Sequence, residues 1–220
     1  MFFPPLILLL ILSFFFIWLF LLGFIHLGII GYAFQKIGLP ADHMMGLLLL
    51  CLLGSFINIP IKKITTTRLI EGEIVGFWGL RFRIPVYRKG CTVVAINLGG
   101  AVIPALISIY LIAHFGQYFR TAMAIAVVAL VTYRFARPVP GVGITVPIFA
   151  PPITAALISL VLTSHAPALA YISGTLGTLI GADLMNLDKL KELQAPVASI
   201  GGAGTFDGIF FTGILAVLLA

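Results

Sequence analysis

The sequence predicts an all-α polytopic membrane protein. Three observations predict this fold class: 61% of the 220 residues are hydrophobic, only 9% are charged, and the mean hydropathy is +1.19. A soluble domain averages about 25% charged residues. The composition therefore excludes a soluble enzyme, a disordered chain and a nucleic-acid-binding protein.

Seven apolar segments have the length and composition of membrane helices, which need about 20 mostly apolar residues. We expect helices at residues 6–30, 42–59, 93–113, 121–133, 148–163, 167–185 and 197–220. Together they form a single transmembrane domain over residues 1–220. The segment 138–147 is rich in proline and glycine and leads into Pro151 and Pro152. Because proline disrupts regular helix, we expect this apolar segment to be re-entrant.

The basic residues predict how the helices are oriented. Seven helices place 11 of the 13 basic residues on one side, and only Lys36 and Arg120 on the other. The eleven are Lys62, Lys63, Arg68, Arg81, Arg83, Arg88, Lys89, Arg134, Arg137, Lys189 and Lys191. Because cytoplasmic loops carry an excess of Lys and Arg, we expect the N-terminus inside and the C-terminus outside the cell membrane.

The polar segment 62–90 is expected to be a basic cytoplasmic β-hairpin inserted between helices two and three. Residues 80–84 alternate strictly between apolar and basic side chains, which is the period of a strand. Residues 74–75 supply a partner strand, with a turn near residues 76–79. The hairpin either rests on anionic headgroups or gates a site in the membrane.

Two aspartates lie within the apolar segments and mark a candidate site. Asp183 is at the inner end of the expected sixth helix, and Asp207 lies 11 residues into the seventh, or about 16 Å deep at 1.5 Å per residue. A carboxylate at that depth must face a polar cavity, pair with another group or stay protonated. We therefore expect a polar site around Asp207 in the inner half of the membrane.

Similar glycine-rich sequences occur in the expected third and seventh helices. One is Gly99-Gly100-Ala101 and the other is Gly201-Gly202-Ala203. Glycine disfavours continuous helix, and a pair of broken helices is typical of transporter binding sites. The alternative is that small residues only let the helices pack closely. The predicted site comprises Asn97, Gly99, Gly100, Asp183, Asn186, Gly201, Gly202, Gly204, Thr205 and Asp207.

We expect no cofactor and no metal site. Cys51 and Cys91 have no metal-binding or redox spacing, and we take both as free thiols. The four histidines, His26, His43, His114 and His165, all fall near the outer ends of the expected helices. A histidine cluster that binds zinc on the outer face is the alternative, although none of the four has the close spacing of a metal motif.

Three segments carry a resemblance to a known family. Residues 97–104 (NLGGAVIP), 170–184 (AYISGTLGTLIGADL) and 198–210 (ASIGGAGTFDGIF) resemble a prokaryotic integral-membrane family catalogued as domain of unknown function sixteen-fourteen. The resemblance covers nearly the whole chain after the first helix. It implies a membrane protein and transfers no activity.

A lesser likeness is to intramembrane aspartyl proteases of the presenilin and signal-peptide-peptidase type. Those enzymes have two membrane aspartates and a Pro-Ala-Leu motif, and this chain has Pro-Ala-Leu at residues 104–106 and 167–169. Here both tripeptides precede Asp183 and Asp207, whereas in those enzymes the motif follows the aspartates.

These observations leave three functions open. The first is a carrier or channel for a small solute or ion, with its site at Asp207, Thr205 and Asn97. The second is an aspartyl hydrolase in which Asp183 and Asp207 activate water. The third is an assembly subunit of a membrane complex whose aspartates pair with Arg134 or Arg137. The expected partners are the lipid bilayer, a small solute, an ion or a membrane-protein substrate, and a second copy of the chain, with no nucleic acid.

Overall fold

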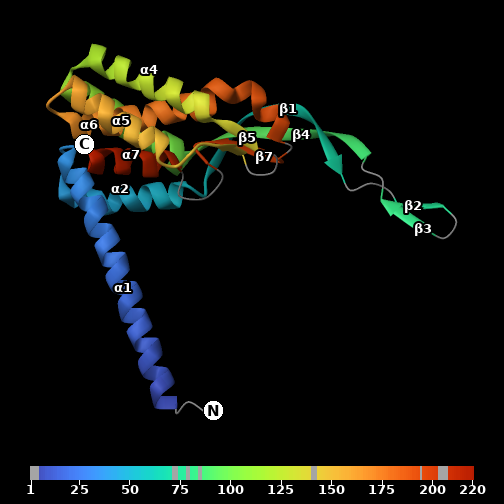
Figure 1. Cartoon of the computed structure of the whole chain (residues 1–220), viewed down its shortest axis with the longest axis horizontal. Helices are drawn as coiled ribbons and strands as arrows, with labels where there is room; N and C mark the ends of the chain where they lie inside the picture. The colour runs from blue at the N-terminus through green and yellow to red at the C-terminus, as the bar shows by residue number, and fades with distance from the viewer. Residues whose placement is uncertain are drawn as a thin grey trace.

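The computed structural model describes residues 5–70, 74–77, 80–83, 86–139, 143–193, 195–202 and 208–220. Helices dominate this part of the chain (Figure 1). The α-helices are α1 (Pro5–Lys36), α2 (Ala41–Gly54), α3 (Ile103–Phe115), α4 (Tyr118–Phe135), α5 (Ala150–Leu162), α6 (Ala166–Thr178) and α7 (Gly208–Leu219). A π-helical turn, η1 (Leu98–Val102), precedes α3. A second π-helical turn, η2 (Leu179–Asp183), and a 3-10 segment, η3 (Leu184–Leu193), extend α6.

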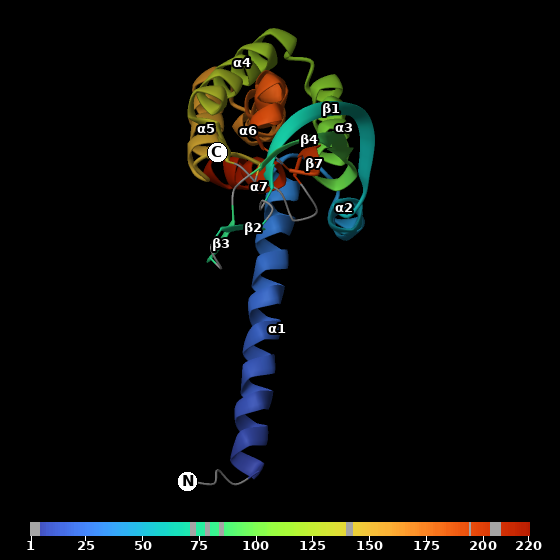
Figure 2. The ribbon, with the colours of Figure 1, turned by 90° about the vertical axis from the view of Figure 1, so that its right-hand side faces the viewer.

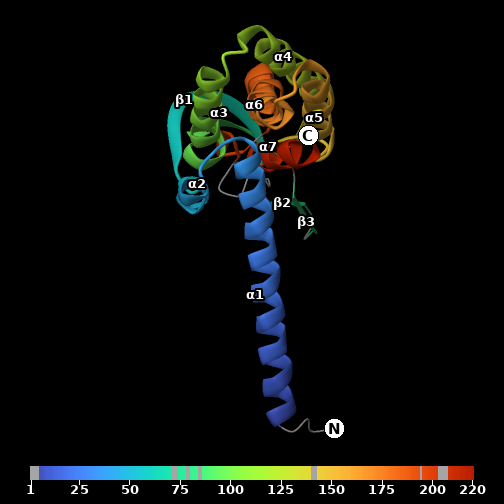
Figure 3. The same cartoon turned by 90° about the vertical axis from the view of Figure 1, so that its left-hand side faces the viewer.

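The bundle is built around α6. Viewed along the bundle, α6 lies between α3, α4, α5 and α7 (Figure 3), and it contacts all four. Alanine, glycine, serine and threonine make up much of α6, and nearly all of its residues are buried. Small side chains let neighbouring helices approach closely, so α6 can contact four partners at once. Gly174, for example, leaves room for Ala155 of α5 and Ala216 of α7.

Three helical segments among the described residues are long and apolar enough to cross a membrane. They are Leu98–Phe115, Tyr118–Phe135 and Ala166–Leu190. The apolar helices of α2, α5 and α7 are shorter, and the 13 residues of α5 rise only about 20 Å, against a hydrocarbon core of about 30 Å. The chain is thus mostly helical, with three candidate membrane-spanning helices among its described residues, while the count of seven full spans stays a prediction.

The first helix extends away from the bundle (Figures 1 and 2). It has 32 residues, which corresponds to about 48 Å, and every side chain from Leu12 to Leu19 is exposed. Its C-terminal turns pack against the other helices, where Phe34, together with Ile37 just after the helix, joins a core with Tyr171 and Val217.

A small sheet adjoins one end of the bundle, so the fold is not purely α-helical. Strand β1 (Asn58–Ile70) pairs antiparallel with β4 (Val86–Asn97), and β4 pairs in parallel with β7 (Val197–Ile200). At the tip of the long β1–β4 ribbon, β2 (Ile74–Phe77) pairs with β3 (Leu80–Arg83). The expected hairpin is therefore present, and β1 and β4 extend it beyond residues 62–90.

Two expected helix starts were wrong. Residues 93–97 belong to β4 and residues 197–200 to β7, so both are strands. The two glycine pairs follow these strands: Gly99 and Gly100 lie in η1 after β4, and Gly201 and Gly202 come directly after β7. The proline-rich segment also contains a short antiparallel pair, β5 (Arg137–Val139) and β6 (Gly143–Thr145); residues 140–142 lie outside the described residues.

The two ends of the bundle differ in charge. At the end with the sheet, which we call the sheet end, lie Lys62 and Lys63 of β1, Arg134 in the last turn of α4, Arg137 of β5 and Lys189 of η3. At the distal end, Lys36 donates a hydrogen bond to the Val217 carbonyl at 3.5 Å. Arg120 is also at the distal end, in the first turn of α4.

Candidate functional site

The two Gly-Gly-Ala sequences meet where β4 and β7 end. Parallel pairing aligns Ile96 with Ile200, which brings the following glycines together. A methyl group on Gly100 would overlap the Gly201 carbonyl, and one on Gly201 would overlap Ala101. Gly201 also has φ +82° and Gly202 has φ +90°, a backbone region that glycine adopts without steric penalty. Close backbone packing therefore explains these glycines.

Asn97 holds the start of the third helix in place. Its Oδ1 accepts a hydrogen bond from the Gly100 amide at 2.7 Å, so it caps η1. Its Nδ2 donates to the Ser55 carbonyl at 2.6 Å and to Asn58 Oδ1 at 3.1 Å. The Ser199 hydroxyl donates to the same Asn58 oxygen at 2.5 Å. Asn97 is 1% exposed, and its amide is thus occupied by partners within the protein.

Asp183 joins the end of α6 to the second glycine sequence. It is the last residue of η2, and its Oδ2 accepts a hydrogen bond from the Gly201 amide at 2.8 Å. A carboxylate that accepts from a backbone N–H makes a charge-assisted bond, which is stronger than a neutral one. Asp183, Gly201, Gly100 and Asn97 therefore form one continuous contact chain across the sheet end of the bundle.

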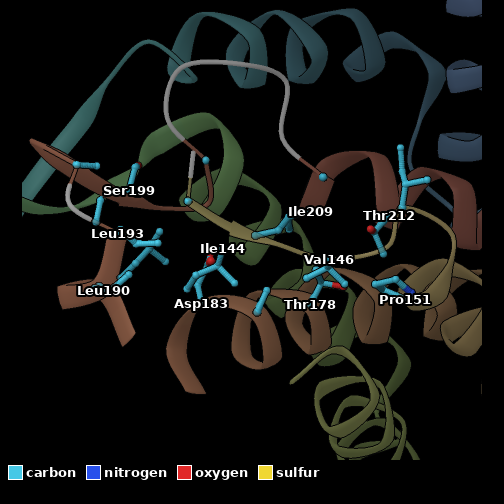
Figure 4. A pocket seen from close by; sticks show the side chains of 18 of the residues that line it. Ile144, Val146, Pro151, Thr178, Asp183, Leu190, Leu193, Ser199, Ile209 and Thr212 are labelled. Carbon is cyan, nitrogen blue, oxygen red and sulfur yellow. The ribbon is translucent and has the colours of Figure 1, made fainter. Parts of the chain in front are cut away.

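Asp183 also lines a cavity of about 460 Å³. The cavity lies among α6–η2, the segment from β6 to α5, strand β7 and the start of α7. In Figure 4, Asp183 and Thr178 lie between one end marked by Leu190 and Ser199 and another marked by Pro151 and Thr212. The described lining residues are Gly143, Ile144, Val146, Pro147, Ile148, Pro151, Thr178, Ala182, Asp183, Leu190, Leu193, Ala195, Val197, Ala198, Ser199, Ile200, Gly202, Gly208, Ile209 and Thr212.

Most of the lining side chains are apolar, and a few polar side chains stand out among them. Thr178 is 5% exposed, and its hydroxyl has no hydrogen-bond partner among the described residues. Thr212 of α7 is 3% exposed and Ser199 of β7 is half-buried. A buried hydroxyl without a partner costs about 1–3 kcal/mol. The Thr178 hydroxyl in a cavity wall therefore points to a ligand or water that satisfies it.

The predicted site residues fall into three groups. Asp183 and Gly202 line the cavity. Asn97, Gly99, Gly100, Gly201 and Asn186 are buried near it and are absent from its described wall. The Asn186 Nδ2 donates to the carbonyls of Gly181 and Ala182 at 2.9 and 3.0 Å, so it supports the end of α6. Gly204, Thr205 and Asp207 lie outside the described residues.

Sequence reasoning missed Thr178, Ser199 and Thr212. Hydroxyl residues are common in apolar helices, and nothing in a single helix shows which of them face a cavity. The residues themselves offered one signal: Thr175 and Thr178 follow Tyr171 at intervals of four and three, which places all three on one face of a helix.

The described part of the chain gives no support to the alternative of a histidine metal site. All four histidines are among the described residues, and there no three His, Cys, Asp or Glu side chains lie close enough to hold a metal ion. His114 and His165 instead pack against Phe115, with ring centroids 5.8 and 5.7 Å apart.

The comparisons with known proteins place the chain in one family. Searches of curated proteins and of solved structures returned no match. One family, described as "Protein of unknown function (DUF1614)", matches residues 52–219. The match takes in the sheet, the cavity and the helices from α3 to α7. The earlier resemblance is thereby confirmed, and the chain belongs to the DUF1614 family of proteins of unknown function.

Proposed function

We propose that the protein is a multi-pass membrane carrier or channel for a small solute, with the cavity beside Asp183 as its binding site. The observation that carries this proposal is the cavity itself. Its volume of about 460 Å³ falls within the range of about 300–1,000 Å³ that is usual for small-molecule sites. Its apolar wall with a few polar groups also has the composition of such sites.

A polar row along α6 supports transport over simple binding. Tyr171, Thr175 and Thr178 share one face of the helix. All three are at least nine-tenths buried, and none of the three hydroxyls has a hydrogen-bond partner among the described residues. Thr178 lines the cavity, and the other two lie closer to the distal end. The row therefore leads from the cavity through the bundle toward the opposite side.

Helix α7 packs closely against this row. A Cβ atom at Gly213 of α7 would lie 2.6 Å from Thr175 Oγ1 and 3.1 Å from the Tyr171 ring. Glycine at this position thus lets the α7 backbone approach the two polar side chains. A hydrolase confined to the sheet end would not require polar groups so far into the bundle.

The aspartyl hydrolase stays the alternative. A hydrolase of this type needs two carboxylates that share a site; Asp183 is the one carboxylate among the described lining residues, and its expected partner Asp207 lies outside the described residues. Asp207 directly precedes Gly208 in the sequence, and Gly208 lines the cavity. We keep the prediction that Asp207 contributes to the site. The assembly-subunit alternative expects the aspartates to pair with Arg134 or Arg137. Both arginines are exposed, and the hydrogen bond found for the Asp183 carboxylate comes from the Gly201 amide.

Cysteine accessibility tests this proposal without knowledge of the solute. In a Cys51→Ala, Cys91→Ser background, Thr178→Cys is treated with a membrane-impermeant cationic methanethiosulfonate. The reagent is applied to right-side-out and to inverted vesicles. A carrier or channel exposes its site to both sides, so we expect labelling in both preparations.

Thr132→Cys is the matched control for this experiment. Thr132 is also fully buried, its hydroxyl has no hydrogen-bond partner among the described residues, and it is not one of the described residues of the cavity wall. We expect no labelling of Thr132→Cys in either preparation. Labelling of Thr178→Cys from one side only would favour an enzyme or binding protein, and labelling from neither side would refute an aqueous site.

A further inference from the structure

Polarity differs between the interior and the mouth of the cavity. The described lining residues that are exposed have no polar side chains: they are Pro147, Ile148, Val197 and Gly208. The threonines of the wall, Thr178 and Thr212, are instead buried. A mouth that opens to water is expected to have the reverse arrangement, because the exposure of apolar groups to water is unfavourable.

The apolar mouth continues along one side of α5, which lies at the periphery of the bundle (Figure 3). Pro147 and Ile148 precede this helix, and Ile148 is 57% exposed. Every exposed residue of α5 is apolar, and these residues are Ile153, Leu157, Leu160 and Val161. Their spacing of three to four residues places them on one face. If the bundle spans the bilayer, as proposed above, this face and the mouth beside it contact lipid.

The interior of the cavity favours an uncharged head group. The Thr178 hydroxyl has no hydrogen-bond partner among the described residues, and it can donate to a ligand or accept from one. No Lys, Arg or His is among the described lining residues, so an anionic head would be buried there without a counter-charge. The Asp183 carboxylate is engaged within the protein by the Gly201 amide and by a further interaction. A cationic head would therefore have to compete for it.

The rest of the wall favours an apolar chain on the same ligand. Ile144, Val146 and Ile209 line the cavity together with Thr178 (Figure 4). Burial of an apolar chain against such residues contributes roughly 25 cal/mol for each Å² removed from water. A ligand that binds here therefore combines a hydrogen-bonding head with an apolar chain.

We propose that the cavity opens to the bilayer beside the start of α5 and binds an uncharged amphiphile, which has a hydroxyl head on an apolar chain. The head bonds to the Thr178 hydroxyl, and the chain leaves past Pro147 and Ile148 toward the exposed face of α5. This proposal rests on the proposed binding site and adds the chemical class of the solute and its route of entry. It explains why the hydroxyls of the wall are buried while its exposed part is apolar.

Tryptophan quenching tests the route of entry. In a Trp18→Phe, Trp78→Phe background, Ile148→Trp is reconstituted into vesicles whose lipids carry bromine on the acyl chains. Leu157→Trp on the exposed face of α5 is the lipid control, and Asp188→Trp on the exposed part of η3 is the water control. We expect brominated lipid to quench Ile148→Trp about as strongly as Leu157→Trp, and iodide to quench only Asp188→Trp. Quenching of Ile148→Trp by iodide and not by brominated lipid would overturn lateral entry.

Photo-cross-linking of the full-length protein in nanodiscs tests the ligand class. The probes are hexadecanol, hexadecanoate and hexadecyltrimethylammonium, each with the same diazirine in its chain. Mass spectrometry measures the adducts on residues 144–162 relative to those on Leu12–Leu19, which are exposed on α1 and report contact with bulk lipid. We expect this ratio to be at least about tenfold higher for the alcohol than for the carboxylate, and higher than for the ammonium.

Two variants locate the head group. Thr178→Val should lower the ratio for the alcohol by about two- to tenfold, which corresponds to the loss of one hydrogen bond. Thr132→Val should leave it unchanged. If Thr178→Val fails to fold, the head-group series on the wild type decides.

Equal ratios for the alcohol and the carboxylate would overturn the ligand class, and so would an alcohol ratio that Thr178→Val leaves unchanged. These failures are separate from failure of the carrier proposal. A protein that prefers the alcohol but exposes Thr178→Cys to one side only would retain the ligand class and lose the carrier. Two-sided labelling without a preference for the alcohol would do the reverse.

Discussion

Gly213 illustrates at the scale of single residues how closely α7 approaches the polar face of α6. Its missing side chain leaves Thr175 and Tyr171 in direct contact with the α7 backbone. Gly46 of α2 is the opposite case, because a Cβ atom there would meet nothing within 4 Å. Gly213 is therefore required by close packing, whereas a substitution at Gly46 would change only the helix propensity.

Gly213→Ala should destabilise the protein. The added methyl would lie 2.6 Å from Thr175 Oγ1, and overpacking of this kind costs about 1–3 kcal/mol. The melting temperature in detergent should fall by about 2–4 °C for each kcal/mol. Gly46→Ala is the control and should leave the melting temperature unchanged or raise it. Equal melting temperatures for Gly213→Ala and the wild type would contradict the close α6–α7 contact.

Of the site residues, the sequence predicted Asp183 because an ionisable group in an apolar segment is costly wherever it lies. That argument needs no tertiary structure. Thr178 and Thr212 could not be found in the same way, because a threonine hydroxyl can bond to its own helix and becomes informative only when its neighbours are known. Asn97 was predicted as a ligand-binding group, whereas the structure shows its amide bonded within the protein.

At the scale of elements, the helices were largely predictable and the strands β4 and β7 were not. Residues 93–96 and 197–200 are short apolar runs that continue directly into longer apolar segments. Hydropathy does not distinguish a buried strand from a helix over so few residues. The boundary signal was the glycine pair after each run, which was interpreted as a break within a helix. The parallel pairing of two segments 104 residues apart has no local signature.

The polar row of α6, formed by Tyr171, Thr175 and Thr178, allows a prediction in which stability and transport change in opposite directions. Thr175→Val keeps the shape of the side chain and removes a buried hydroxyl that has no partner among the described residues. Since such a hydroxyl costs about 1–3 kcal/mol, the variant should melt at a higher temperature than the wild type. If the row belongs to the transport path, the same variant should transport more slowly.

Thr132→Val is the control for Thr175→Val. It removes from α4 an equally buried hydroxyl that has no partner in the described part of the chain, so it should also raise the melting temperature. Its transport rate should remain that of the wild type. Unchanged transport by Thr175→Val would show that the polar row is not part of the path.

At the scale of the whole molecule, the two ends of the bundle carry different sets of basic residues. Basic residues of β1, α4, β5 and η3 gather at the sheet end, whereas Lys36 and Arg120 are at the distal end. By the positive-inside rule the sheet end and the β1–β4 ribbon should face the cytoplasm. Helix α7 leads from the sheet to the distal end, so Ala220 should lie outside.

Labelling of single cysteines tests this orientation. In the Cys51→Ala, Cys91→Ser background, Arg81→Cys and Ala220→Cys are exposed separately to an impermeant maleimide in intact cells. Only Ala220→Cys should react before lysis, and both should react after it. Reaction of Arg81→Cys in intact cells would reverse the orientation or show that the ribbon crosses the membrane.

Two-sided accessibility of the cavity tests most directly the claim that the cavity beside Asp183 is a transport site. In the Cys51→Ala, Cys91→Ser background, Thr178→Cys is reacted with an impermeant methanethiosulfonate in right-side-out and in inverted vesicles. We predict labelling of Thr178→Cys in both preparations and no labelling of Thr132→Cys in either. Labelling of Thr178→Cys from one side only, or from neither side, would contradict the account.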